Sequence, residues 1–259
     1  MKRVLVTGAN GQLGLAIKAS QTSYAELSFV FAGKAELDVT DAQQIEAFFE
    51  NHAFDFCINA AAYTNVDKAE EDKEAAYVLN ETAPRLLAET CKQHSVFLIH
   101  ISTDYVFDGT KGAPYTTADI PNPINVYGAS KLAGEQAIVA VGGDYCIVRT
   151  SWLYSEYGNN FQTKIIGKAE SVPYLEVVGD LYGTPTYAPN LVVFLLNKIK
   201  GLAFASKVYH FSDGETMSWY DLAKQLTDKA INEIASEALN LKAKRPKNTP
   251  LSALKKKDA

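Results

Sequence analysis

Short apolar runs alternate along the chain with segments of helical periodicity, and this alternation restricts the fold more than any other feature. Many of the runs are apolar on both faces, as expected for parallel strands that helices cover on each side. Alternating strands and helices with right-handed crossovers predict an α/β protein with a doubly wound parallel sheet. We expect strands at residues 4–7, 27–32, 54–60, 97–102, 145–149, 175–178 and 208–211, and helices at 11–20, 40–52, 67–95, 127–141 and 187–200.

Capping signals mark several helix boundaries. Thr40 with Gln43, and Ser218 with Asp221, each place a hydroxyl three residues before a side chain that can reach back to it. Pro84 is expected to separate a short helix from a longer one, because proline disrupts a helix interior.

Two segments, residues 155–186 and 212–259, interrupt the alternation and contain aromatic, glycine and proline residues. We expect them to form a smaller C-terminal lobe over the carboxyl edge of the sheet, where ligands bind in such folds. The larger domain would then consist of residues 1–154 and 187–211.

Composition argues against several classes of function. Hydrophobic residues make up 47% of the chain, but no segment approaches the run of about 20 apolar residues that a membrane span needs. The net charge of −5 argues against a nucleic-acid partner, which requires a basic face. The apolar run that follows Arg3 is too short for a signal peptide, so we expect a cytoplasmic protein.

Cysteines and histidines show no pattern of metal ligands. Cys57, Cys91 and Cys146 are far apart and lie in apolar segments, which predicts small core residues in a reducing compartment. The four histidines are expected to be ordinary surface or core residues, and no metal site is predicted.

The first strand runs into a glycine-rich turn with glycines at positions 8, 11 and 14, and then into a helix. Glycines let the backbone approach a pyrophosphate, whose charge is stabilised at the helix N-terminus. The spacing is G-x-x-G-x-x-G rather than G-x-G-x-x-G, but the turn has the required strand and helix around it. The pattern predicts dinucleotide binding in a Rossmann-type fold, with a tight structural turn as the alternative.

The acidic residue expected about 20 positions after the turn is missing. The second strand ends at Gly33 and Lys34, so no carboxylate repels a 2′-phosphate and a lysine could attract one. NADPH is therefore the expected cofactor, with NADH as the alternative. A solvated loop lysine would explain Lys34 equally well. Asp38 and Val39 would lie along the adenine.

Tyr127 and Lys131 are about one helical turn apart, so both side chains project from the same face. A free tyrosine has a pKa of about 10, and a neighbouring cation lowers it. Bringing the pKa to about 7 requires about 4 kcal/mol, within reach of one cation and a positively charged cofactor ring. The spacing alone is more typical of an ordinary exposed helix face.

Thr103 ends the fourth strand, at the carboxyl edge of the sheet. Its hydroxyl could hydrogen-bond a substrate carbonyl while Tyr127 donates a proton, although a threonine at a strand end is usually structural. Small residues at 60–62 leave room for a flat ring or a ribose, or simply let a helix pack on the sheet. By default, Trp152 and Phe161 would belong to the core of the lobe.

Taken together, these segments resemble the extended branch of the short-chain dehydrogenase/reductase superfamily, and within it the dTDP-4-dehydrorhamnose reductase family. The resembling segments occur in family order and cover nearly the whole chain: residues 6–14, 59–70, 102–109, 125–135, 149–154, 158–161, 180–186 and 245–249.

The resemblance implies three groups of site residues. The catalytic group would be Thr103, Tyr127 and Lys131. The cofactor would contact Tyr127 and Lys131 together with Gly8, Asn10, Gly11, Gln12, Leu13, Gly14, Asp38, Val39, Ala60, Ala61 and Tyr63. The dTDP-sugar pocket would contain Thr103 together with Val66, Asp104, Val106, Trp152, Asn160, Phe161, Lys164 and Arg245.

The resemblance also implies a reaction, the NADPH-dependent reduction of dTDP-4-dehydro-L-rhamnose to dTDP-L-rhamnose, a precursor of surface polysaccharide. The larger domain would bind NADP(H) and the lobe would bind the sugar. Two alternatives stay open: a non-catalytic, NADP-binding regulatory subunit of the same fold, and a related nucleotide-sugar epimerase or dehydratase. A dehydratase would need a second acid besides Asp104, which weakens that alternative.

The chain departs from the family in two respects. Family members usually continue with another helix after the segment that here spans residues 245–249, so a truncated C-terminus is expected. Some relatives dimerise through acidic residues that hold Mg²⁺. Those residues find no match here, so Mg²⁺ stays unassigned and a homodimer is one option.

Overall fold

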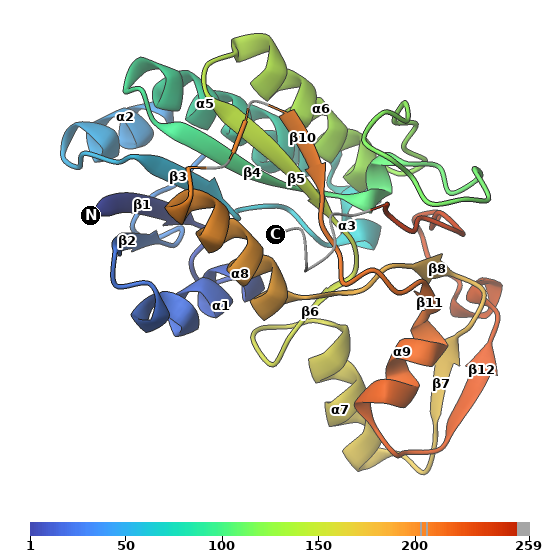
Figure 1. Cartoon of the computed structure of the whole chain (residues 1–259). Helices are drawn as coiled ribbons and strands as arrows, with labels where there is room; N and C mark the ends of the chain where they lie inside the picture. The colour runs from blue at the N-terminus through green and yellow to red at the C-terminus, as the bar shows by residue number, and fades with distance from the viewer. Residues whose placement is uncertain (203, 206, 253–259) are drawn as a thin grey trace.

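The central feature of the computed structural model, which describes residues 1–202, 204–205 and 207–252, is a parallel sheet of six strands (Figure 1). The strand order is β10-β5-β4-β3-β1-β2, so the direction of winding reverses between β1 and β3. Ligands bind at such a switch point in open α/β sheets. The strands are β1 (Lys2–Thr7), β2 (Leu27–Ala32), β3 (Phe56–Asn59), β4 (Phe97–Thr103), β5 (Tyr145–Thr150) and β10 (Lys207–His210).

Helices cover both faces of the sheet (Figure 1). Successive side chains of a strand point to opposite faces, so Val4 and Val6 enter one core while Leu5 enters the other. One face packs against α1 (Gln12–Ser20) and α8 (Ala188–Lys200), and the other against α2 (Ala42–Glu50), α5 (Ala83–Gln93) and α6 (Val126–Val141). The prediction of a doubly wound parallel sheet is confirmed.

The connection from β3 to α5 is a series of short helical pieces instead of the single helix expected at 67–95. It contains α3 (Val66–Glu71), α4 (Lys73–Tyr77) and a π-helical turn (Val78–Thr82). The break between a short helix and a longer helical stretch is at Asp72, whose backbone is not helical, so the predicted role of Pro84 was wrong. Pro84 lies in the first turn of α5, directly after the π-helical turn, and does not interrupt the helix.

The capping predictions had mixed outcomes. The cap of α2 is Asp41, whose carboxylate accepts the N–H groups of Gln43 and Gln44, so the prediction of Thr40 was wrong by one residue. A carboxylate bonds the free N–H groups at a helix start more strongly than a hydroxyl does. The capping box of Ser218 and Asp221 is confirmed at the start of α9 (Trp219–Leu226).

A second, smaller group of elements lies beyond the carboxyl ends of the central strands (Figure 1). It contains α7 (Phe161–Ser171), α9 and a parallel pair formed by β7 (Leu175–Val178) and β12 (Ile231–Ile234), and it has its own hydrophobic cluster around Ile165 and Leu175. Short pairs join the two groups: β6 (Leu153–Tyr154) with β9 (Thr186–Tyr187), and β8 (Tyr182–Gly183) with β11 (Met217–Ser218). The part of the expected lobe at 253–259 lies outside the described residues.

The three cysteines were predicted to be small core residues, and Cys57, Cys91 and Cys146 are indeed buried free thiols. Within the described ranges, no helix is long and apolar enough to cross a bilayer.

Candidate active site

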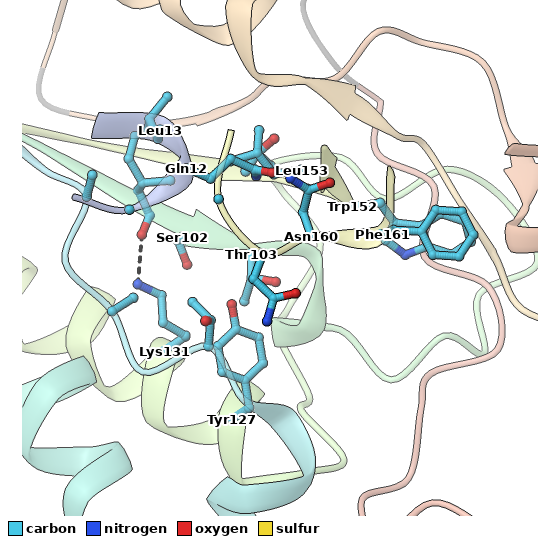
Figure 2. A pocket seen from close by; sticks show the side chains of 18 of the residues that line it. Gln12, Leu13, Ser102, Thr103, Tyr127, Lys131, Trp152, Leu153, Asn160 and Phe161 are labelled. Carbon is cyan, nitrogen blue, oxygen red and sulfur yellow. Dashed lines mark hydrogen bonds between the residues drawn. The ribbon is translucent and has the colours of Figure 1, made fainter. Parts of the chain in front are cut away.

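A cavity of about 490 Å³ lies where β1, β3, β4 and β5 end (Figure 2). The glycine-rich turn forms one side, α6 another, and residues from α7 and α9 close the far side. Eleven of the predicted site residues line it: Asn10, Gly11, Gln12, Leu13, Ala60, Thr103, Tyr127, Lys131, Trp152, Asn160 and Phe161.

A second cavity of about 510 Å³ lies on the other side of the same turn. The two cavities share Gly11, Ala60 and Ala62, so they adjoin across the switch point of the sheet. The remaining predicted cofactor residues, other than Gly14, line this second cavity: Gly8, Asp38, Val39, Ala61 and Tyr63. Lys34 lines it as well.

The glycines of the turn allow close backbone approach. Gly8 has a φ of +63°, and a Cβ there would lie 2.6 Å from the amide nitrogen of Ala61. A Cβ at Gly14 would lie 2.6 Å from the backbone of Ala9, so Gly14 serves helix–strand packing instead of lining a cavity.

The turn also leaves polar groups available to a ligand. Gly11 is the N-cap of α1, and no side chain among the described residues caps its free N–H groups. The side-chain oxygens of Gln12 and Tyr63 are buried without a hydrogen-bond partner in the part of the chain described. Buried polar atoms are normally satisfied, so these two fit a polar ligand such as a dinucleotide.

Tyr127 and Thr103 face one another in the first cavity (Figure 2). Thr103 accepts the N–H of Tyr105 at 3.1 Å. Tyr127 is the second residue of α6, whose first turn is fixed by its N-cap Asn125. Burial raises the pKa of Tyr127 to about 12, although its hydrogen bond with Thr103 acts in the opposite direction. The phenol therefore keeps its proton, and the pKa near 7 predicted with a positively charged cofactor ring beside Tyr127 stays a prediction.

Lys131 is 2% exposed and is directed toward the sheet (Figure 2). Its Nζ donates to the carbonyl oxygen of Ile101 at 2.7 Å and lies 3.2 Å from Nε2 of His100. Burial lowers the pKa of Lys131 to about 8 while Glu135 acts to raise it. Lys131 is not among the groups that shift the pKa of Tyr127 here, and its hydrogen-bond contacts are with Ile101 and His100.

His100 is a residue whose role sequence analysis missed. It is fully buried, and Asn59 hydrogen-bonds its Nδ1 at 3.1 Å while Lys131 contacts its other nitrogen. His100 thus fixes the position of the lysine. The sequence does place His100 three residues before Thr103 on the same strand. Strand position alone, however, does not reveal that His100 contacts Lys131 of α6.

Three aromatic rings form the far wall of the cavity. Trp152 has a φ of +48° and stacks face to face on Trp219, with ring centroids 3.7 Å apart. The ring centroid of Phe161 lies 4.4 Å from the ring centroid of Trp219. A Cβ at Gly183 would come within 2.6 Å of the Trp152 ring, so glycine is required there. Trp219 lines the cavity but was not predicted as a site residue. The capping box at Ser218 predicted where the helix begins, but it does not reveal where the side chain of the first helical residue points.

Asn160 contributes mainly through its local bonds. It caps α7, and its Nδ2 donates to the carbonyl oxygens of Ser155 and Tyr157, both at 2.8 Å. It therefore shapes the loop that closes this side of the cavity.

Five residues assigned to the sugar pocket do not line the cavity as the structure describes it. Asp104 is 1% exposed behind Thr103, Val106 is fully buried in a separate core, and Arg245 forms an ion pair with Asp67 at 2.6 Å. Lys164 is exposed on α7, and Val66 begins α3. The wall of this cavity therefore does not include these five, and their contacts with the sugar stay predictions. The described residues also contain no group of three or more His, Cys, Asp or Glu that could hold a metal ion.

Known proteins place this site in a family. A family model described as the RmlD substrate binding domain matches residues 1–259. The dTDP-4-dehydrorhamnose reductase of Aggregatibacter actinomycetemcomitans is 35% identical over 270 residues, covering 98% of this chain and 92% of that protein. The chain belongs to the dTDP-4-dehydrorhamnose reductase family.

Solved structures agree with this family. The dTDP-4-dehydrorhamnose reductase of Bacillus anthracis, solved in complex with NADP, superimposes with a TM-score of 0.93 at 36% identity, covering 98% of this chain and 92% of that one. The UDP-glucose 4-epimerase of Thermus thermophilus superimposes with a TM-score of 0.81 at 18% identity, covering 96% and 90%, and shares only the fold.

Proposed function

We propose that this reductase-family chain uses NADPH to reduce the 4-keto group of dTDP-4-dehydro-L-rhamnose, giving dTDP-L-rhamnose. The observation that carries the proposal is the pair of hydroxyls, Tyr127 and Thr103, in a cavity that adjoins a glycine-rich nucleotide turn. Membership of a family whose relatives are named as reductases supports the reaction, and the NADP complex of the Bacillus anthracis relative supports the cofactor.

The two adjoining cavities fit the two halves of a dinucleotide. The pyrophosphate would lie on the turn, held by the backbone N–H groups of Gln12 and Leu13 and by the charge of the α1 N-terminus. Asp38 and Val39 would border the adenine, and Lys131 the nicotinamide ribose. When bound, the nicotinamide supplies the hydride.

Tyr127 would donate its proton to the oxygen at C4 of the sugar. The raised pKa of Tyr127 keeps the phenol protonated before the reaction, and a sugar alkoxide is the stronger base, so the transfer is favourable. The hydroxyl proton of Thr103, which is directed at Asp104 at rest, would turn to the same oxygen and donate a hydrogen bond to it as its charge develops. Because the site is buried, both hydroxyls act in a medium of low dielectric, where they stabilise charge strongly.

The aromatic wall would bind the remote parts of the substrate. Trp152, Trp219 and Phe161 present flat apolar surface, which suits the hydrophobic face of a 6-deoxy sugar or a thymine ring. Binding energy gained there would hold the keto group next to Tyr127.

The decisive experiment uses the purified chain, NADPH and the dTDP-keto-sugar. We expect NADPH to be oxidised and dTDP-L-rhamnose to form, with the product identified by mass spectrometry. A chain that binds NADPH without oxidising it would instead support the regulatory alternative. A product that is epimerised without NADPH consumption would support the epimerase.

Lys34 provides a test of cofactor preference. It lines the cavity on the adenosine side, so we expect Lys34→Ala to lower kcat/KM for NADPH by about tenfold relative to NADH, through loss of a charged phosphate contact. Lys168→Ala, which removes an exposed lysine of α7, is the matched control. An unchanged ratio of the two kcat/KM values for Lys34→Ala would contradict this role.

We further propose that the domain division follows the predicted boundaries, with residues 1–154 and 187–211 binding NADP(H). The separate hydrophobic cluster around Ile165 supports a distinct lobe. Residues 244–251 are an exception, because they hydrogen-bond to elements of the larger domain. A cytoplasmic location and a homodimer also belong to this proposal; Mg²⁺ does not.

A further inference from the structure

The segment 244–249, which we call the C-terminal brace, contacts the supports of the active site without lining its cavity in the described structure. The carbonyl oxygen of Lys244 accepts from Nδ2 of Asn125 at 2.9 Å, and Arg245 pairs with Asp67. At its other end, Oγ1 of Thr249 donates to Oδ2 of Asp104 at 2.6 Å. The brace can therefore affect the reaction only through the residues that it contacts, Asn125, Asp67 and Asp104.

Asp104 connects the brace to the hydroxyl of Thr103. Its carboxylate is buried, and Oδ1 accepts from Oγ1 of Thr103 at 3.2 Å while Oδ2 accepts from Thr249. A threonine hydroxyl has one proton and two lone pairs. At rest the proton is directed at Asp104 and one lone pair is taken by the N–H of Tyr105, and these two bonds fix the Thr103 oxygen beside the phenol of Tyr127 (Figure 2).

Resting on the function proposed above, we propose that Thr249 is a positioning residue for the reduction. Its hydroxyl fixes the orientation of the Asp104 carboxylate, and that carboxylate fixes the orientation of the Thr103 hydroxyl beside Tyr127. Thr249 is 1% exposed, so its short hydrogen bond with Asp104 does not compete with bulk water.

The other end of the brace supports Tyr127. Asn125 accepts the N–H of Gly128 at 2.8 Å as the cap of α6, and uses its Nδ2 to bind Lys244. Backbone bonds between Tyr182 and the brace, 2.8 Å to Lys247 and 2.9 Å to Thr249, hold the segment in register. Both hydroxyls of the site thus depend on one short segment.

The charge of Asp104 gives this arrangement a pH dependence. Burial raises the pKa of Asp104 to about 6, and the Thr249 hydrogen bond lowers it. The titratable groups that act on or face Asp104 are the phenols of Tyr105 and Tyr127, and the pair of Arg245 and Asp67 lies beyond Tyr105. Removing the Thr249 hydroxyl destabilises the ionised carboxylate of Asp104, so the pKa of Asp104 must rise further.

The test compares Thr249→Val with Thr249→Ser and Thr184→Val. In Thr249→Val we expect kcat to fall about tenfold or more with little change in KM for the keto-sugar, because the orientation of a catalytic group is lost and no substrate contact is removed. The acid limb of its kcat/KM profile should move up by about one to two pH units. Thr249→Ser keeps the hydroxyl and should restore the wild-type profile.

Thr184→Val is the matched control, since Oγ1 of Thr184 accepts the N–H of Leu251 at 3.1 Å and so holds the chain two residues after Thr249 without a hydrogen bond to Asp104. It should keep the wild-type pH profile. An unshifted acid limb in Thr249→Val, or an equal shift in Thr184→Val, would overturn the inference.

Two further measurements keep the outcomes distinct. In an Asp104→Asn background, Thr249→Val should cause no additional change in pH profile; an additional shift there would show that Thr249 acts by another route. If Thr249→Val does not fold, the pH profiles of Asp104→Asn and Thr249→Ser provide the test. The inference is supported if Asp104→Asn loses the acid limb of kcat/KM while Thr249→Ser retains it. Any other result overturns the inference. A wild-type chain that fails to oxidise NADPH overturns the proposed function and this inference with it, whereas an active wild type with an unaltered Thr249→Val overturns only the inference.

Discussion

Tyr127→Phe is expected to lower kcat by about a thousandfold, because general acid catalysis by a positioned side chain contributes about 10²–10⁴ to the rate. The substitution removes one oxygen from a buried ring that otherwise keeps its packing against Tyr105, so the fold should survive. The rate of NADPH oxidation with the keto-sugar measures the effect, and calorimetry should show NADPH binding close to wild type.

Tyr154→Phe is the control for this substitution. Tyr154 lies in β6 near the cavity but not on its wall, so the loss of its hydroxyl should leave the rate near wild type. A Tyr127→Phe enzyme that retains more than about a tenth of the wild-type rate would rule out a proton-donor role of the magnitude expected for general acid catalysis.

Gly128→Ala is expected to impair both stability and turnover. A Cβ at Gly128 would overlap the carbonyl oxygen of Tyr105, so the first turn of α6 and the 3₁₀ turn at Asp104–Val106 must move apart. Overpacking of this kind costs about 2–3 kcal/mol of unfolding free energy. The same movement separates Tyr127 from Thr103, and a shift of about 1 Å can lower kcat by about a hundredfold.

Urea unfolding and the rate of NADPH oxidation measure the two effects of Gly128→Ala. Gly167→Ala is the matched control, since Gly167 lies within helix α7 and a Cβ there meets nothing within 4 Å. That variant should be unchanged in rate and more stable by about 0.5–1 kcal/mol, as expected for alanine in a helix. Equal stability of the two variants would contradict the proposed overlap.

The sheet and the glycine-rich turn could be predicted because their determinants are local. In β1, alternate residues serve two cores, and Gly8 requires a positive φ; both facts follow from a few neighbouring positions. Tyr127 and Lys131 were found for the same reason, since their spacing on one helix brings them to one face. Even so, the cap of α2 was misplaced by one residue, because a carboxylate next to the hydroxyl competes for the same N–H groups.

The remaining features depend on contacts between distant segments. Trp219 reaches Trp152 across the two groups of elements, and Thr249 reaches Asp104 from the end of the described chain. Burial, which sequence spacing does not reveal, raises the pKa of Tyr127, and the hydrogen bond of Lys131 goes to Ile101.

The stacked pair of Trp152 and Trp219 also makes the site directly observable by spectroscopy. These are the only two tryptophans in the chain, and both line the cavity. At a centroid separation of 3.7 Å their excited states are coupled, so near-ultraviolet circular dichroism reports their mutual geometry. All indole fluorescence of the chain therefore originates at the cavity wall, and the arrival of a nucleotide-sugar can be followed in real time without an added label.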